Sequence, residues 1–221
     1  MPWHLKKAAA LLALLFAFSA HAAQKPNILF IMADDLGYGD IGCYGAKPEN
    51  LKTPNIDRLA ANGLQFTNGY CSASTCTPTR FSFLTGKYAF RQNNTGIAPP
   101  NGPAIIQPGV ETLPSLLKRA GYKTAVIGKW HLGLGWQMLP NGEKRQAKIG
   151  PTKGDGWQID YGKKVSGGPL AIGFDESFII PASLDMFPYV YLQNDKPTAW
   201  ATVTKAFHRA GPSAEDFDAI N

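Results

Sequence analysis

The sequence lacks the usual marks of a membrane-anchored or nucleic-acid-binding protein. Its apolar stretch at residues 8–18 is too short for a comfortable bilayer span. No cysteine stands near residue 23, where that stretch gives way to polar sequence, so a lipid anchor is not indicated. Its basic residues are not interleaved with aromatic residues in a patch, which argues against a nucleic acid partner. We therefore expect neither a membrane anchor nor bound nucleic acid.

Cysteine and histidine are also scarce. The three cysteines are Cys43, Cys71 and Cys76, and an odd count leaves at least one thiol unpaired. An unpaired thiol in an oxidising compartment is a liability unless it is used or modified. A Cys43–Cys71 disulfide would leave Cys76 alone, although spacing cannot establish pairing. Beyond residue 23 the histidines are His131 and His208, and we expect His208 to be solvated.

Residues 1–23 have the pattern of an export signal. Lys6 and Lys7 form a basic end, residues 8–18 an apolar core, and residues 20–22 a small-x-small cleavage pattern. A buried N-terminal helix is the alternative. Removal of the leader would leave residues 24–221, enough for one sizeable core, with a mild basic excess that suits an anionic substrate. The pattern predicts an exported protein, periplasmic or secreted.

Alternating strand and helix signals predict an α/β fold. Residues 26–32 form a continuous apolar run typical of a strand covered on both faces of a parallel sheet. Helix signals at residues 53–63 and about 112–120 include an early proline and a glycine at the end, here Gly63 and Gly121, and Thr53 is the expected N-cap of the first helix. Shorter strands are expected at residues 64–66, 122–127, 177–180 and 189–192, and a surface loop at 141–168. We expect a mostly parallel central sheet flanked by helices.

Two aspartates, Asp34 and Asp35, follow the first predicted strand directly. Ligands of open α/β sheets bind beyond the carboxyl ends of the strands. Adjacent carboxylates repel one another, and a hard cation would relieve that repulsion. The alternative is that the pair caps a turn beside the glycines that follow.

The segment from Cys76 to Gly86 joins a thiol to a helix start. Pro78 can open a helix, so the thiol of Cys76 would face the positive end of that helix, where an anion is favoured. Arg80 follows one helical turn later and can lie on the same side. This arrangement predicts a nucleophile beside an anion site. A buried structural cysteine with a surface arginine is the alternative.

A second polar cluster follows the strand expected at residues 122–127. Lys129 and His131 are two residues apart, so in an extended chain they would point to the same side and could meet one small anion. A half-buried, hydrogen-bonded histidine is the alternative for His131. At the end of the next strand, Ser183 could also contact the anion, or it could bond to its own backbone in a turn.

Several segments together resemble the sulfatases, the formylglycine-dependent, arylsulfatase-like enzymes of the alkaline-phosphatase-like superfamily. Cys76-x-Pro78-x-Arg80 followed by Leu84-Thr85-Gly86 is similar to the sulfatase signature. The Asp pair at 34–35, the Thr-Pro-Asn-x-Asp-x-Leu-Ala run at 53–60 and the Gly-Lys-Trp-His-Leu-Gly segment at 128–133 match at corresponding places. The resemblance implies an alkaline-phosphatase-like α/β fold and hydrolysis of sulfuric esters.

The resemblance also implies two cofactors. Cys76 would be oxidised by a formylglycine-generating enzyme to formylglycine, an aldehyde that is hydrated to a diol. Asp34, Asp35 and the modified Cys76 would ligate Ca²⁺. The substrate would be a sulfated glycan or a small aryl sulfate.

Roles for the remaining site residues follow from the same resemblance. Lys129 would contact the sulfate, and Arg80 would hold the diol. His131 would hold the formylglycine and assist its regeneration. Ser183 is the candidate for a further contact to the sulfate.

The match stops before the sulfatase pattern is complete. No Asp-Asn-Gly run is present to complete the calcium site, and Ca²⁺ prefers six to eight oxygen ligands. We therefore expect residues 24–221 to be a truncated N-terminal part of a sulfatase catalytic domain, with exposed apolar surface. Two alternatives stay open: a phosphate or phosphonate ester hydrolase of the same superfamily, and an inactive fragment.

Overall fold

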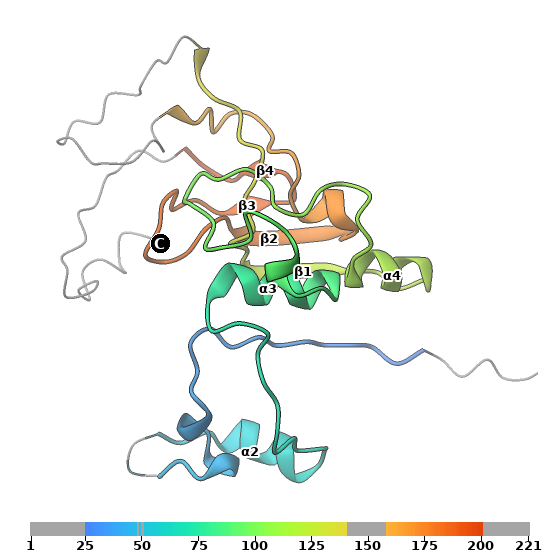
Figure 1. Cartoon of the computed structure of the whole chain (residues 1–221), viewed down its shortest axis with the longest axis vertical. Helices are drawn as coiled ribbons and strands as arrows, with labels where there is room; N and C mark the ends of the chain where they lie inside the picture. The colour runs from blue at the N-terminus through green and yellow to red at the C-terminus, as the bar shows by residue number, and fades with distance from the viewer. Residues whose placement is uncertain (1–24, 48, 50, 141–157, 201–221) are drawn as a thin grey trace, which may run out of the picture. The chain divides into compact units, whose positions relative to one another are not determined.

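The computed structural model describes residues 25–47, 49, 51–140 and 158–200 of the chain (Figure 1). The chain divides into two compact units, residues 1–65 and 66–221. The predicted export signal and His208 lie outside the described residues, as does most of the predicted loop at 141–168. Within the described part, no helix has both the length and the apolar character needed to cross a membrane.

The first unit is built from short helices. It contains the 3-10 helices η1 (Tyr38–Asp40) and η2 (Gly42–Tyr44) and the α-helix α2 (Pro54–Ala61). Thr53 precedes α2 as predicted, but its hydroxyl does not cap that helix. It accepts from the Gly42 N–H at 2.8 Å and donates to Asp57 at 3.1 Å, and Asp57 also accepts from the Cys43 N–H at 2.7 Å. Thr53 and Asp57 therefore fasten η2 to α2.

Two strands predicted in the first part of the chain are absent. Residues 26–32 and 64–66 contain no strand, and Leu29 is 85% exposed. A strand requires a neighbour that completes its hydrogen-bond ladder. No described residue of the first unit is in a strand, so the apolar run at 26–32 lacks such a neighbour there. The predictions were wrong because apolar composition identifies a strand only when a partner is present.

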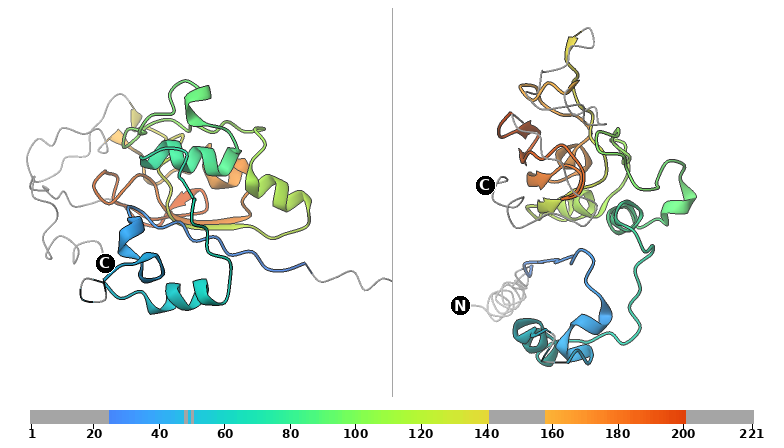
Figure 2. Two further views of the ribbon diagram at one scale, coloured as in Figure 1. Left: turned by 60° about the horizontal axis from the view of Figure 1, so that its bottom comes forward. Right: turned by 90° about the vertical axis from the view of Figure 1, so that its left-hand side faces the viewer.

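The second unit holds a sheet of four strands in the order β1-β2-β3-β4 (Figures 1 and 2). Its elements are α3 (Cys76–Thr85), α4 (Leu113–Arg119), β1 (Ala125–Lys129), β2 (Glu176–Ile180), β3 (Leu192–Gln193) and β4 (Lys196–Pro197), with the 3-10 helices η3 (Ala89–Arg91) and η6 (Pro169–Ile172). The pair β1–β2 is parallel, whereas β2–β3 and β3–β4 are antiparallel. The α/β prediction is confirmed, and the described sheet is mixed.

The first strand of this sheet begins later than the sequence indicates. The prediction covered residues 122–127, but β1 runs from Ala125 to Lys129. The reason is Asp175, whose carboxylate accepts from the Thr124 N–H at 2.9 Å and whose own N–H donates to the Thr124 carbonyl at 2.9 Å. These bonds replace the sheet ladder before Ala125.

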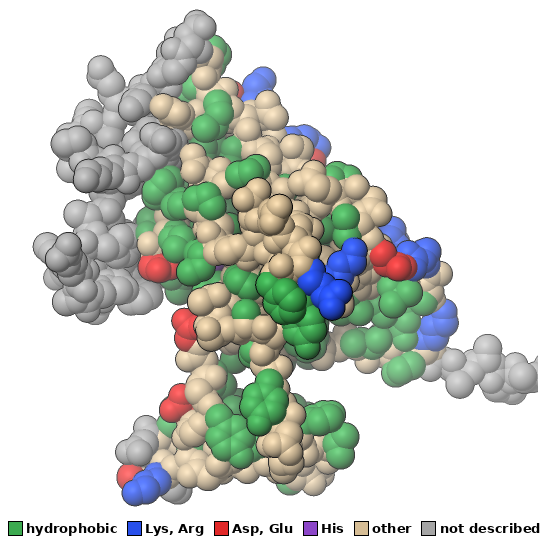
Figure 3. All heavy atoms as spheres, in the orientation of Figure 1, with side chains coloured by type: hydrophobic (Ala, Val, Ile, Leu, Met, Phe, Trp, Pro, Cys, Tyr) green, Lys and Arg blue, Asp and Glu red, His purple; other side chains and the backbone are tan. Residues whose placement is uncertain are grey.

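The core of the second unit gathers side chains from α3, the sheet and the segment after β1. Its members include Phe81, Leu84, Trp130, Leu132, Ile179 and Leu192. The alternate residues Ile127 and Phe178 are neighbours in register on the other face, and they are 80% and 42% exposed. Phe178 stacks on Tyr191 with ring centroids 5.1 Å apart. The expected exposed apolar surface is thus present, and Figure 3 shows hydrophobic side chains at the surface.

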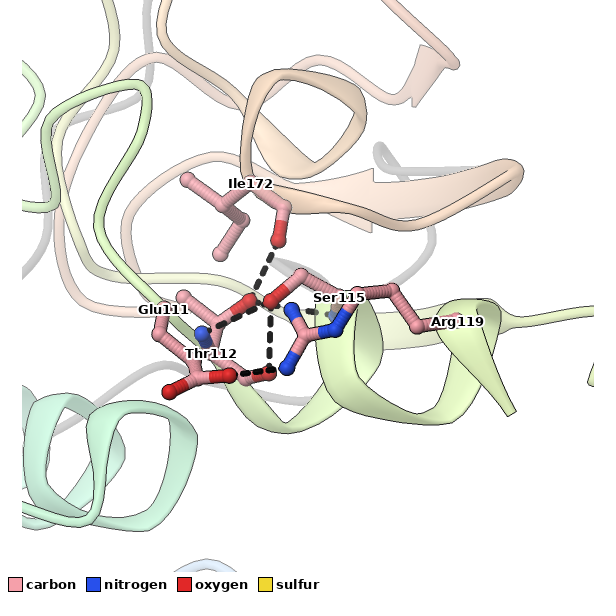
Figure 4. A network of polar contacts seen from close by, with 5 residues as sticks. All are labelled: Glu111, Thr112, Ser115, Arg119 and Ile172. Atoms are coloured by element: carbon pink, nitrogen blue, oxygen red, sulfur yellow. Dashed lines mark hydrogen bonds and ion pairs between the residues drawn. The ribbon is translucent and has the colours of Figure 1, made fainter.

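Helix α4 begins with a capping box that is shown in Figure 4. The Thr112 hydroxyl accepts from the Ser115 N–H at 3.3 Å, and the Ser115 hydroxyl accepts from the Thr112 N–H at 2.9 Å. Buried Thr112 also donates its hydroxyl proton to the Ile172 carbonyl at 2.5 Å. This one hydroxyl therefore joins the start of α4 to the turn that leads into β2.

Thr112→Val should destabilise the protein by about 2 kcal/mol, because it removes a helix cap and leaves the buried Ile172 carbonyl without its donor. Valine keeps the size and branching of threonine, so lost packing should add little. Urea unfolding would measure the change. Glu111→Ala removes an exposed ion pair to Arg119 beside the same cap and should cost under about 0.5 kcal/mol. Equal losses for the two variants would contradict the role assigned to Thr112.

Candidate active site

Cys76 is the first residue of α3 and is half-buried. Thr75 before it is extended, with φ −133° and ψ 160°, so the chain turns sharply into the helix at the cysteine. Phe81 and Leu84 of α3 are buried in the core, which fixes how the helix presents its first turn. The Cys76 side chain therefore stands at the end of the helix where the backbone N–H groups carry partial positive charge.

Two cations meet at this helix end. The Lys129 ammonium donates to the Cys76 sulfur at 3.1 Å. The Arg80 guanidinium donates from Nη1 to the Lys129 carbonyl at 2.5 Å, which ties α3 to the last residue of β1. The structure thus brings together Cys76, Arg80 and Lys129, which are up to 53 positions apart in sequence. These cations would stabilise negative charge that develops on a group bound beside the Cys76 sulfur.

His131 lies two residues after the end of β1, and its backbone is not extended. Its φ is 51°, in the left-handed region, so the expected alternation of Lys129 and His131 along a strand does not apply. The His131 N–H donates to the Pro181 carbonyl at 3.0 Å, and its Nε2 lies 3.1 Å from the Ala98 carbonyl oxygen. The side chain is buried, and Nδ1 has no hydrogen-bond partner among the described residues.

Thr77 connects α3 to the histidine segment. It is fully buried, and its hydroxyl donates to the His131 carbonyl at 2.8 Å. The same oxygen accepts from the Ala98 N–H at 3.0 Å. Thr77 fills a variable position of the Cys-x-Pro-x-Arg pattern, and its role was not foreseen from the sequence.

The environment of His131 favours its neutral form. Burial lowers the pKa of His131 below its ordinary value of 6.5, and the positive charges of Lys129 and Arg80 lower it further. The hydrogen bond to Ala98 and the charge of Asp185 oppose this shift, but they do not reverse it. His131 is therefore set to accept a proton rather than to carry one.

Asp185 is a charged neighbour of the site that was not foreseen from the sequence. It follows Ser183 in the turn after β2, and a hydrogen bond from the Ser183 side chain holds the pKa of Asp185 below its ordinary value. The charges of Lys129 and His131 lower that pKa further. Burial, with a contribution from Asp185, raises the pKa of Tyr189 to about 12. The sequence signal that could have predicted this role is the position of Asp185, an acidic residue two positions after Ser183 at a strand end.

Ser183 itself is buried, and its hydroxyl forms a hydrogen bond with the Asp185 carboxylate. Its backbone forms an isolated bridge with Met186, which closes the turn. The group bonded to the Ser183 side chain is thus a neighbouring carboxylate and not the residue's own backbone. Through Asp185, the turn that carries Ser183 acts electrostatically on Lys129 and His131.

A buried glycine closes the histidine segment. Gly133 has φ 70°, and a Cβ added there would lie 2.0 Å from the Pro103 carbonyl oxygen. Residues on either side bond to the same loop: Ile105 N–H donates to the Leu132 carbonyl at 3.0 Å, and Leu134 N–H donates to the Gly102 carbonyl at 2.9 Å. Close approach of the 102–105 loop thus requires glycine at position 133.

The predicted metal ligands Asp34 and Asp35 belong to the first unit, whereas Cys76 belongs to the second. Both aspartates are exposed, and Asp35 has a left-handed φ of 61°. Paired hard carboxylate oxygens fit the donor preference of Ca²⁺, but two residues do not fill its coordination shell. Among the described residues no group of three His, Cys, Asp or Glu side chains could hold a metal.

All three cysteines are free thiols in the structure. Cys43 is half-buried in the first unit, and its carbonyl accepts from the Gln65 side chain at 2.8 Å. Cys71 is exposed in the second unit. The Cys43–Cys71 disulfide considered from the sequence is not formed, and Cys76 is the thiol that has an ammonium group beside it.

Comparison with known proteins identifies the family of the chain. The sulfatase family model matches residues 26–147, which span more than half of the chain. An N-acetylgalactosamine-6-O-sulfatase of Bacteroides thetaiotaomicron is 47% identical over 172 residues, which cover 78% of this chain and 30% of that protein. Human steryl-sulfatase is 46% identical over 130 residues, which cover 56% and 22%. The chain spans less than a third of the length of these relatives.

Solved structures similar to this chain support the same family. One described under the metabolism of multiple glycosaminoglycans by Bacteroides thetaiotaomicron has a TM-score of 0.66 and 46% identity, over 80% of this chain and 32% of that chain. Ps i-CgsB, also solved in complex with k-i-k-neocarrahexaose, has a TM-score of 0.54 in its first structure and 30% identity, over 72% and 29%. These likenesses confirm the predicted alkaline-phosphatase-like α/β fold. The chain belongs to the sulfatase family.

Proposed function

We propose that the full-length protein containing this chain is a sulfuric ester hydrolase whose chemistry takes place at Cys76. The observation that carries this proposal is the Lys129 ammonium 3.1 Å from the Cys76 sulfur at the N-terminus of α3. A sulfate ester bears negative charge and develops more on its oxygens as it reacts, so this is where cations and helix N–H groups are most effective.

The chain's own residues have distinct parts in this proposal. Lys129 binds a sulfate oxygen beside position 76, and Ser183 is a further candidate for contact with the sulfate. Arg80, fixed to the Lys129 carbonyl, holds the modified side chain and offsets charge. His131, kept neutral by burial and by two neighbouring cations, takes up a proton at position 76.

A metal ion and a modified side chain would complete the proposed site. Asp34, Asp35 and the modified Cys76 would hold Ca²⁺, which supplies positive charge for the sulfate oxygens. A formylglycine-generating enzyme would convert Cys76 to formylglycine, which supplies a hydroxyl nucleophile when hydrated. The half-buried Cys76 side chain, with an ammonium beside its sulfur, fits such a group.

The substrate proposed is a sulfated glycan, with aryl sulfates as test compounds. The Bacteroides relative is named an N-acetylgalactosamine-6-O-sulfatase, and Ps i-CgsB was solved in complex with k-i-k-neocarrahexaose. The export pattern at residues 1–23 supports a periplasmic or secreted location. Because the chain matches under a third of its relatives, we expect the 221 residues alone to turn over little or no ester.

Parallel assays of an aryl sulfate, a phosphate monoester and a phosphonate monoester would test the function on the full-length protein. We expect the sulfate to be preferred. The tryptic peptide containing Cys76 should be about 18 Da lighter than its sequence mass, as expected for the signature. Preference for a phosphorus ester would favour the alternative hydrolase of the superfamily. Turnover by the 221-residue chain would contradict the expectation that it is inactive alone.

The pH profile should report on His131. Its pKa is lowered by burial, so it stays neutral and able to accept a proton down to a pH below 6.5. Activity should therefore fall on the acid side only as the pH passes below that ordinary value. Measuring kcat against pH for wild type and His131→Asn would check this. An acid limb above pH 6.5, or one unchanged in the variant, would contradict the assignment.

A further inference from the structure

We propose that Thr77 is a positioning residue, which acts with the backbone of Ala98 to hold His131 in one tautomer, protonated on Nε2, with the Nδ1 lone pair left as the acceptor. The inference rests on the proposed function, because the tautomer matters for turnover only if chemistry occurs at Cys76. Thr77 touches neither substrate nor reacting atoms in this proposal; it acts through His131.

The hydroxyl of Thr77 is both a hydrogen-bond donor and a hydrogen-bond acceptor. It donates to the His131 carbonyl at 2.8 Å and accepts from the Ala98 N–H at 3.0 Å. Only a hydroxyl on a short side chain can do both from this position. Because Thr77 is fully buried, water cannot take over either bond.

Ala98 closes the network and determines the tautomer. Its carbonyl oxygen lies 3.1 Å from His131 Nε2, and a carbonyl can only accept. Nε2 must therefore carry the proton whether the imidazole is neutral or charged. In the neutral ring Nδ1 is then the acceptor, and Nδ1 is buried without a hydrogen-bond partner among the described residues.

The backbone at His131 also requires support. A left-handed φ of 51° is uncommon for a residue other than glycine. The peptide is held on one side by the bond from His131 N–H to the Pro181 carbonyl, and on the other by the bond from Thr77 to the His131 carbonyl. Loss of the Thr77 hydroxyl would remove the hydrogen bond that holds the His131 carbonyl.

The charges around the His131 ring favour the neutral imidazole over the protonated one. The charged groups that act on His131 are Lys129 and Arg80, which disfavour its protonation, and Asp185, which favours it. Burial adds to the effect of the two cations. With one proton on the ring, its location on Nε2 or Nδ1 decides which nitrogen can accept, and Thr77 with Ala98 assigns it to Nε2.

The test compares Thr77→Ala with Thr77→Ser in the full-length protein, since these two variants differ by one hydroxyl oxygen. Turnover of an aryl sulfate is divided by the formylglycine content of the Cys76 peptide, which removes any effect on modification. We expect Thr77→Ala to lower kcat on the order of 100-fold with KM changed by less than about threefold, and Thr77→Ser to stay within about threefold of wild type.

A second measurement reports the tautomer of the His131 imidazole directly. Nitrogen-15 NMR of histidine-labelled protein, assigned with His131→Asn, should show the Nε2-protonated tautomer in wild type and Thr77→Ser and a mixture in Thr77→Ala. Equal kcat in the two Thr77 variants, or an unchanged tautomer in Thr77→Ala, would overturn the proposal. So would a Thr77→Ala protein that fails to fold while Thr77→Ser folds, since the hydroxyl would then serve stability. If wild type turned over no sulfate ester, the proposed function would fail, and the NMR comparison would still decide the role of Thr77.

Discussion

Cys76→Ala in the full-length protein should lower turnover of an aryl sulfate by about 10⁴-fold or more, because the variant removes the only atom at this position that can become a nucleophile. The change leaves Lys129, Arg80 and the start of α3 in place, so binding of inorganic sulfate should change far less than turnover. Steady-state kinetics and isothermal titration with sulfate would measure the two effects separately.

Cys43→Ala and Cys71→Ala are the matched controls for Cys76→Ala. Both remove a free thiol, and neither thiol has the ammonium contact found at position 76. They should keep kcat within about threefold of wild type, as expected for substitutions away from the chemistry. Appreciable turnover by Cys76→Ala would place the nucleophile elsewhere and remove the basis of the proposed function.

Lys129→Met should lower kcat/KM about 100- to 1,000-fold, because the ammonium 3.1 Å from position 76 is lost at the point where charge develops. Methionine keeps much of the length and apolar stem of lysine, so the variant tests the charge more than the packing. Kinetics should show the loss for sulfate esters, and thermal unfolding should show little change.

Lys164→Met is the control for Lys129→Met. Lys164 pairs with Asp195 at 3.0 Å on the surface of the same unit, and an exposed pair of this kind contributes little. Its removal should leave kcat/KM within about twofold. A Lys129→Met enzyme as active as Lys164→Met would show that the ammonium beside Cys76 has no part in catalysis.

Much of the site follows from local sequence signals. Cys76 at the start of a helix, Arg80 one turn later and Lys129 at the end of a strand were all predicted, and the structure brings the three together. These predictions succeed because a helix N-terminus and the carboxyl end of a strand are local features that position side chains in known directions.

The remainder depends on contacts that no local pattern encodes. The bonds of Thr77 to His131 and Ala98 span 54 and 21 positions, and they exist only once the chain has folded. The left-handed backbone at His131 likewise depends on partners in distant segments, so the assumption of an extended chain failed there. The strand expected at residues 26–32 failed for the same reason, because composition does not supply a pairing partner.

Gly133 limits which substitutions the segment after β1 could accept. The first carbon of any side chain at that position would meet the Pro103 carbonyl oxygen, in a loop held to both neighbours of the glycine. A mutant library spanning codons 128–133 would therefore lose most of its members at codon 133 alone. Randomisation aimed at the proposed ester specificity is better directed to the turn after β2 around Leu184, whose side chain is 53% exposed and open to replacement.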